Sequence, residues 1–206
     1  MSRRIGVVLA VVALTLSVAG AGVVLHQRGG GDEPISSAGG EALHLSPIEG
    51  VTYFLQGDPV WATETLGAGG ETMAAAGCTV SSLAMGLSAL GYPLNPGEMR
   101  AALEEADGFT DSGQVIWSAV GEITHGAVRI GLPPPSYEVI DAELSEGRPV
   151  VVKILLSGVV PHWVLLVGKQ ERDYLAMDPL NRQMELVRLS DRSAAIEAVR
   201  VFQFSE

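Results

Sequence analysis

Five short apolar runs in the second half of this chain constrain its fold more than any other feature. They span residues 149–156, 163–169, 173–177, 183–189 and 199–204. The turns between them are short, which allows antiparallel pairing but not the long crossovers of a parallel sheet. The run Val164-Leu165-Leu166-Val167 is apolar at every position, which predicts a central strand buried on both faces. We therefore expect an antiparallel sheet here.

Helical periodicity dominates the residues before these runs. Apolar residues after Cys78 fall at offsets of 0, 3, 4, 7 and 10 across residues 80–90, which is one face of a helix. A second helix is predicted from Asn95, because Pro96 suits the first helical position and Glu98 stands three residues after the cap. Further helices are expected at 116–123 and 137–146. Helices followed by an antiparallel sheet indicate the α+β class.

The N-terminus has the layout of an export segment. Residues 1–4 include two arginines, and residues 5–25 carry no charge, a length that can just cross a bilayer. The arginines favour an orientation with residues 1–4 in the cytoplasm and the domain outside the cell, on a single-pass transmembrane anchor. A cleavable signal peptide, with Ala19-Gly20-Ala21 as its cleavage site, would give a secreted domain instead.

A Gly-, Ser- and acid-rich stretch follows the apolar segment. Residues 26–46 show no periodicity, and we interpret them as a flexible linker. The folded domain is then expected to span residues 47–206 and to open with a short strand at 51–55.

Charge and cysteine content narrow the function. The chain has 24 acidic and 13 basic residues and a net charge of −11, which argues against binding to nucleic acid. Its single cysteine cannot form an internal disulfide, so an exported domain must rely on its core. The acidic loop at 107–113 lacks the ligand spacing of a calcium-binding loop. We expect no metal or cofactor, and the sequence does not indicate an oligomeric state.

Cys78 is the first candidate for chemistry. It stands where a Gly-containing loop gives way to the predicted helix, and the N–H groups and dipole of a helix start favour a thiolate. The alternative interpretation is a buried structural thiol.

His162 and Asp178 form a second candidate pair. His162 begins the apolar central strand, and Asp178 ends the next one. Antiparallel neighbours place the start of one strand beside the end of the next, so we expect the two side chains at one sheet edge. An aspartate there would orient the imidazole. The alternatives are a half-buried polar residue at a strand start and an ordinary Asp-Pro turn.

The order of these residues resembles the peptidase C39-like families of the papain-like cysteine peptidase superfamily. The resemblance covers residues 51–189. It is carried by 56–61 (QGDPVW), Gly77-Cys78-Thr79, Trp117, 161–164 (PHWV) and Met177-Asp178-Pro179. It differs from bacteriocin-exporting relatives in that no ATP-binding or multi-span segment accompanies the domain.

The resemblance implies a papain-like fold, with an N-terminal helical part packed on a C-terminal antiparallel sheet. It further implies that Cys78 is the nucleophile, His162 the general base and acid, Asp178 the orienting residue and Gln56 the side-chain donor of an oxyanion hole. The expected function is hydrolysis of a peptide or protein outside the cytoplasm. A non-catalytic peptide-binding module and an acyltransferase of the same fold remain alternatives.

Overall fold

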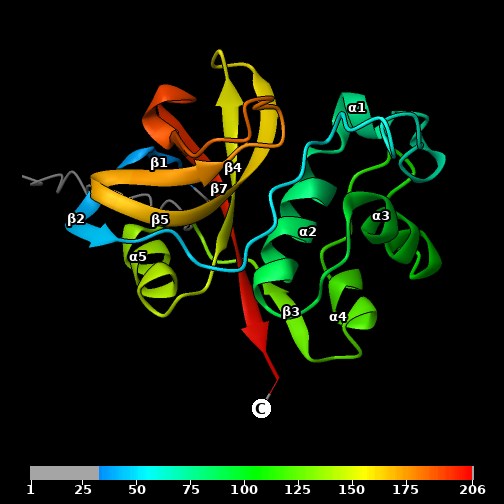
Figure 1. The fold of residues 1–206 in the computed structure, drawn as a ribbon, viewed down its shortest axis with the longest axis horizontal. Coiled ribbons are helices and arrows are strands. Elements are labelled where there is room, and N and C mark those ends of the chain that lie inside the picture. Colours follow the sequence, from blue (N-terminus) through cyan, green and yellow to red (C-terminus); the bar gives the residue numbers. More distant parts are fainter. Residues whose placement is uncertain (1–32, 206) are drawn as a thin grey trace, which may run out of the picture.

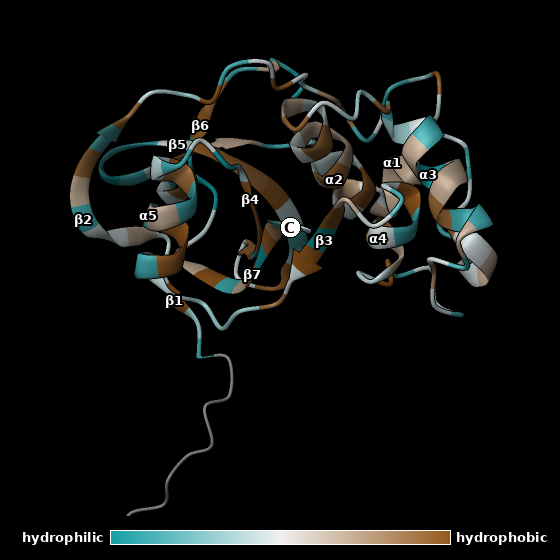
Figure 2. Cartoon of the chain, turned by 90° about the horizontal axis from the view of Figure 1, so that it is seen from below, coloured by the Kyte–Doolittle hydropathy of each residue, from teal (hydrophilic) through white to brown (hydrophobic). Residues whose placement is uncertain are grey.

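The computed structural model describes residues 33–205. Helices α1 to α4 lie on one side of an antiparallel sheet, and α5 lies on the other (Figures 1 and 2). The helices are α1 (Met73–Ala76), α2 (Cys78–Ala89), α3 (Pro96–Glu105), α4 (Ala119–Ile123) and α5 (Tyr137–Ser145), with short 3-10 turns η1 (Gly67–Gly69) and η2 (Leu189–Asp191). The predicted mixture of helices and antiparallel sheet is confirmed.

The sheet has seven strands in the order β1-β7-β4-β5-β2, with β3 also paired to β7 and β6 to β5. Every pairing is antiparallel. The strands are β1 (Ile35–Ser36), β2 (Ala38–Leu45), β3 (Val128–Gly131), β4 (Val150–Leu156), β5 (Val160–Met177), β6 (Val187–Arg188) and β7 (Ala195–Phe204).

Strand β5 folds back on itself, and this reversal positions the site. Figure 1 shows its ribbon turning near its middle, where residues 170–172 are exposed and Glu171 has a φ of 56°. Sixteen residues of straight strand would span about 50 Å. Instead, His162 and Asp178, sixteen residues apart, touch. The two separate strands predicted at 163–169 and 173–177 are therefore the two arms of β5.

The central strands are buried on both faces, as the sequence predicted. Val164, Leu165, Leu166 and Val167 are all fully buried. Their side chains alternate between two cores, so Leu165 packs toward α2 and Leu166 toward α5. Both cores are needed to fix the sheet between its helical layers.

Gly86 allows helix α2 to lie close to the sheet. A Cβ at this position would lie 2.3 Å from the ring of Phe202 on β7. Glycine thus lets the helix backbone approach the sheet. The depth of α2, and with it the position of its first residue, depends on this contact.

Several local predictions are confirmed. Helix α3 begins at Pro96, and Asn95 caps it reciprocally with Glu98: the Glu98 N–H donates to Asn95 Oδ1 at 3.0 Å, and the Asn95 N–H donates to Glu98 Oε2 at 2.9 Å. Helix α5 and strands β4 and β7 lie where the sequence indicated them.

Other local predictions are wrong. Residues 35–45, interpreted as linker, form β1 and β2 and extend the sheet, because backbone pairing with β7 and β5 orders a segment that lacks side-chain periodicity. Residues 51–55 form no strand. The run at 183–189 contributes only β6, and the third helix is shorter than expected, beginning at Ala119. Strand β3 was not predicted.

A buried ion pair joins α5 to β5 on the face away from α2. Lys169 Nζ lies 2.6 Å from Asp141 Oδ1, and the Tyr174 hydroxyl donates to the same oxygen at 2.8 Å. Lys169 is fully buried. The Glu41 N–H of β2 donates to Asp141 Oδ2 at 3.3 Å, so the cluster also holds the edge strand. Burial, together with the Asp141 carboxylate, raises the pKa of Tyr174.

We predict that Lys169→Met lowers the free energy of unfolding by about 3 kcal/mol, because it leaves the buried Asp141 carboxylate without its cation. Urea unfolding measures this difference. Lys153→Met removes the chain's other, partly exposed lysine as a control and should change stability by less than about 1 kcal/mol. A Lys169→Met protein as stable as the wild type would contradict this account of the cluster.

Candidate active site

Cys78 is the first residue of α2 and lies on the wall of a cleft between the helices and the sheet. Helix α1 ends at Ala76, and Gly77 makes the junction. A Cβ on Gly77 would lie 2.5 Å from the Met73 carbonyl oxygen, so a larger residue would push the two helices apart. The N–H groups of the first turn and the helix dipole favour a negative charge at this thiol.

His162 and Asp178 form a buried pair beneath the cleft. His162 Nε2 lies 2.6 Å from Asp178 Oδ1, and the two residues are 2% and 0% exposed. The predicted meeting of these side chains at one sheet edge is present. Because Nε2 faces the carboxylate, Nδ1 is the ring nitrogen left for a partner in the cleft.

Cys78 is that partner. The two side chains line the same cleft, and the hydrogen-bonding and charge interaction between them shifts both of their pKa values. Burial raises the pKa of the thiol, but the hydrogen bond and charge of His162 outweigh burial and hold the pKa below its ordinary value. Burial lowers the pKa of His162, whereas Asp178 and Cys78 raise it, to about 9. Both shifts favour the thiolate and imidazolium over the neutral thiol and imidazole.

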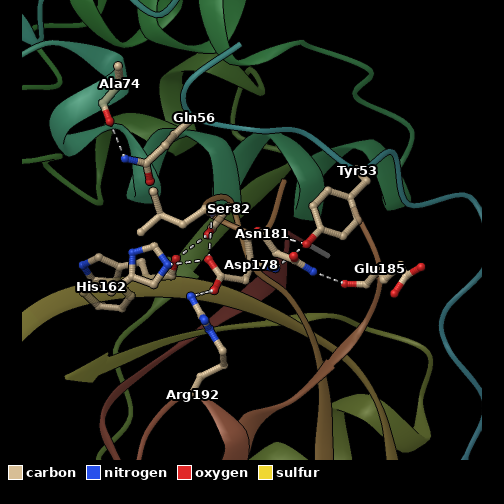
Figure 3. A network of polar contacts seen from close by, with 11 residues as sticks. Tyr53, Gln56, Ala74, Ser82, His162, Asp178, Asn181, Glu185 and Arg192 are labelled. Atoms are coloured by element: carbon tan, nitrogen blue, oxygen red, sulfur yellow. Dashed lines mark hydrogen bonds and ion pairs between the residues drawn. The ribbon is translucent and has the colours of Figure 1, made fainter. Parts of the chain in front are cut away.

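The Asp178 carboxylate is held from several sides (Figure 3). The Leu180 N–H donates to Oδ1 at 2.8 Å. The Tyr53 hydroxyl donates to the Asp178 carbonyl and accepts from its N–H, both at 2.9 Å. Arg192 Nη2 lies 2.5 Å from Oδ2. Burial raises the pKa of Asp178, but the hydrogen bond and charge of His162, with smaller contributions from Leu180 and Arg192, leave it lowered.

Gln56 reaches the same cleft from the segment before α1. Its backbone N–H donates to the Pro179 carbonyl at 3.1 Å, which ties it to the residue after Asp178. Its side chain is buried, and Nε2 donates to the Ala74 carbonyl at 2.9 Å. An amide nitrogen has two hydrogens, so one N–H remains. Although 22 residues separate Gln56 from Cys78 in sequence, both line the cleft.

The cleft has a volume of about 500 Å³. Glu71, from the loop before α1, and Lys153 of β4 are the charged lining residues besides those of the site, and Leu156, Val160 and Leu180 contribute apolar side chains. The other lining residues are Leu66, Ala74, Ala75, Ala76, Thr79, Val80, Ser112, Gly113, Gln114, Val115, Pro161, Trp117 and Trp163.

Two tryptophans singled out by the sequence pack together behind His162. The rings of Trp117 and Trp163 are 4.9 Å apart at 61°, and the Arg200 guanidinium lies 5.1 and 5.2 Å from them. Ser82 of α2 donates to the Trp163 carbonyl at 3.1 Å. These contacts fix the backbone beside His162 to the cysteine helix.

Sequence reasoning did not identify Tyr53 or Arg192 as part of this arrangement. Tyr53 was assigned to a strand, and Arg192 lies just after η2, 14 residues beyond Asp178. Both residues make contacts with Asp178 that are tertiary, and no local sequence pattern predicts such contacts. A tyrosine in an apolar run before a predicted site is the only signal the chain offered.

Two other histidines and the predicted N-terminal anchor lie away from this site or outside the described residues. His44 is exposed on β2, 3.5 Å from Glu171. In the described part of the chain, no cluster of three or more His, Cys, Asp or Glu residues suits a metal ion. None of the helices within 33–205 is long and apolar enough to span a membrane. The expected anchor at 5–25 lies outside the described residues, as does His26.

Comparison with known proteins places the fold. No protein-family model and no curated protein matches the sequence. Among solved structures, the chain is similar to a crystal structure described as a "putative C39-like peptidase from Bacillus anthracis". The match has a TM-score of 0.52 and 15% sequence identity, and it covers 80% of this chain and all of that one. The chain therefore has the fold of a C39-like peptidase.

We predict that the His162 imidazole titrates with a pKa of about 9. The imidazolium should persist at neutral pH and disappear only as the pH rises through that value. Cys78→Ala removes the thiolate that favours the imidazolium, so the pKa should fall. NMR of ¹³C-labelled histidine measures both values, with His162→Ala assigning the signal. An unchanged pKa in Cys78→Ala would show that the two side chains do not interact.

Proposed function

We propose that this chain is a cysteine peptidase or amide hydrolase that acts through an acyl-enzyme on Cys78. One observation carries the proposal: Cys78, at a helix start, lines the same cleft as His162, whose Nε2 lies 2.6 Å from the fully buried Asp178. The fold of a C39-like peptidase supports it. So does the arrangement in which the cysteine begins helix α2 while His162 lies on strand β5 and Asp178 directly follows that strand.

Acylation begins when Cys78 Sγ attacks the carbonyl carbon of the substrate amide. The S–C bond forms, and the π electrons of the carbonyl move onto its oxygen. The remaining Gln56 side-chain N–H and the Cys78 backbone N–H would donate to this oxyanion. As it collapses, the C–N bond breaks and the His162 imidazolium gives its proton to the leaving nitrogen. A thioester and a neutral imidazole remain.

Deacylation reverses the roles. Water attacks the thioester carbon while neutral His162 accepts its proton, and the S–C bond breaks to release the acid. The thiolate and imidazolium are restored. Asp178 does not react: it keeps Nε2 of the imidazole facing inward and Nδ1 facing the thiol.

We further propose that the enzyme acts outside the cytoplasm, on a peptide or protein. The support is the N-terminal sequence, in which arginines precede an uncharged stretch of 21 residues. The membrane is then a partner through that segment alone, as an anchor or as a signal that is removed.

We predict that Cys78→Ala abolishes cleavage of a mixed peptide library, because the substitution removes the sulfur that forms the acyl-enzyme. Mass spectrometry of the library detects the products. The substitution should leave the unfolding midpoint close to that of the wild type, which separates lost chemistry from lost folding. Peptide binding without cleavage by the wild type would favour the binding module, and transfer to an added amine would favour the acyltransferase.

For Gln56→Ala, we predict a decrease in kcat of about 10²–10³-fold with little change in KM, because an oxyanion donor acts mainly in the transition state. Gln170→Ala, at the exposed turn of β5, is the matched control and should retain wild-type kcat. If kcat in Gln56→Ala also stays at the wild-type value, Gln56 is not an oxyanion donor.

A further inference from the structure

Among the residues that the structure describes, Arg192 is the charged group outside the expected site residues that forms an ion pair with the Asp178 carboxylate. It follows η2 and reaches the second carboxylate oxygen, Oδ2, from below in the view of Figure 3. Its Nη2 lies 2.5 Å from Oδ2, while His162 Nε2 lies 2.6 Å from Oδ1. One buried anion is thus shared between two cations, each on its own oxygen.

The location of Asp178 makes this sharing consequential. The carboxylate is fully buried, where charges interact far more strongly than in water. Oδ1 also accepts the Leu180 N–H, and the Tyr53 hydroxyl fixes the backbone of Asp178, whereas Oδ2 is held by the ion pair with Arg192. The Arg192 side chain itself is 31% exposed, so its charge reaches a solvent-facing surface.

We propose that Arg192 is a positioning residue that sets the basicity of His162 by neutralising part of the Asp178 charge. This inference rests on the proposed function. An imidazole facing an unshared carboxylate would hold its proton too firmly to act as the base in deacylation. Arg192 pairs with the same carboxylate and also repels the imidazolium directly. Both effects make it easier for the imidazolium to lose its proton, so neutral His162 is available as the base in deacylation.

Other charged groups lie near the series of contacts that runs from Cys78 through His162 and Asp178 to Arg192. Cys78 of α2 faces His162, and Glu71 and Lys153 line the cleft beside it. Asp191 and Glu197 lie with Arg192 in a second hollow of about 440 Å³ on the sheet side. The Arg200 guanidinium lies over the ring of Trp163. Among the described residues, Arg192 is the cation paired with the second oxygen of Asp178, Oδ2.

The test is the titration of ¹³C-labelled His162 in the full chain, in wild type and in Arg192→Gln. Loss of the Arg192 charge should raise the pKa of His162 by about one pH unit, since it removes a repulsive charge and leaves Asp178 to the imidazolium alone. Arg192→Lys keeps the charge and should return the pKa close to the wild-type value. Arg192→Met is a second neutral variant that keeps the aliphatic stem.

Arg188→Gln is the matched control, because it removes one positive charge from the same segment at an exposed position on β6. It should leave the titration unchanged. An unchanged or lowered pKa in the neutral Arg192 variants would overturn the inference, as would failure of both variants to fold while Arg192→Lys folds, since Arg192 would then be structural. A wild-type His162 that titrates near 6.5 would instead remove the thiolate–imidazolium pair and the proposed function itself.

Discussion

The burial of the Asp178 carboxylate is the constraint on which the rest of the site depends. A carboxylate with no solvent contact must be paired and hydrogen-bonded. Otherwise the carboxyl group would ionise less readily, and its charge would destabilise the fold. His162, Arg192 and the Leu180 N–H meet that requirement. The same contacts fix the imidazole in one orientation, with its second nitrogen toward the cysteine helix. Structural necessity and the proposed chemistry therefore use the same atoms.

Residues far from His162 in sequence determine how the helical layer and the sheet meet at the site. The reversal of β5 brings both ends of one strand to a single edge of the sheet. Gly86 lets α2 approach β7, and Ser82 joins the helix to the backbone beside His162. The cysteine is thus placed by helix-to-sheet packing and its partners by strand pairing, which explains why a cleft forms between them.

The sequence predicted what periodicity and local order encode. The apolar run at 164–167, the capping of α3 by Asn95 and the meeting of His162 with Asp178 followed from burial, cap chemistry and antiparallel geometry. Strand β2 escaped prediction because its order comes from backbone pairing with β5 rather than from its Gly-rich residues. Arg192 escaped because an ion pair between distant turns leaves no local pattern.

The rate of Cys78 alkylation by iodoacetamide against pH, in wild type and His162→Ala, tests the central claim most directly. An ordinary cysteine has a pKa of about 8.5, and a thiolate facing an imidazolium should react well below that pH. His162→Ala should lose that low-pH reactivity and behave as an ordinary thiol. If both proteins react slowly and with the same pH dependence, no such pair exists, and the cleft does not contain an activated nucleophile.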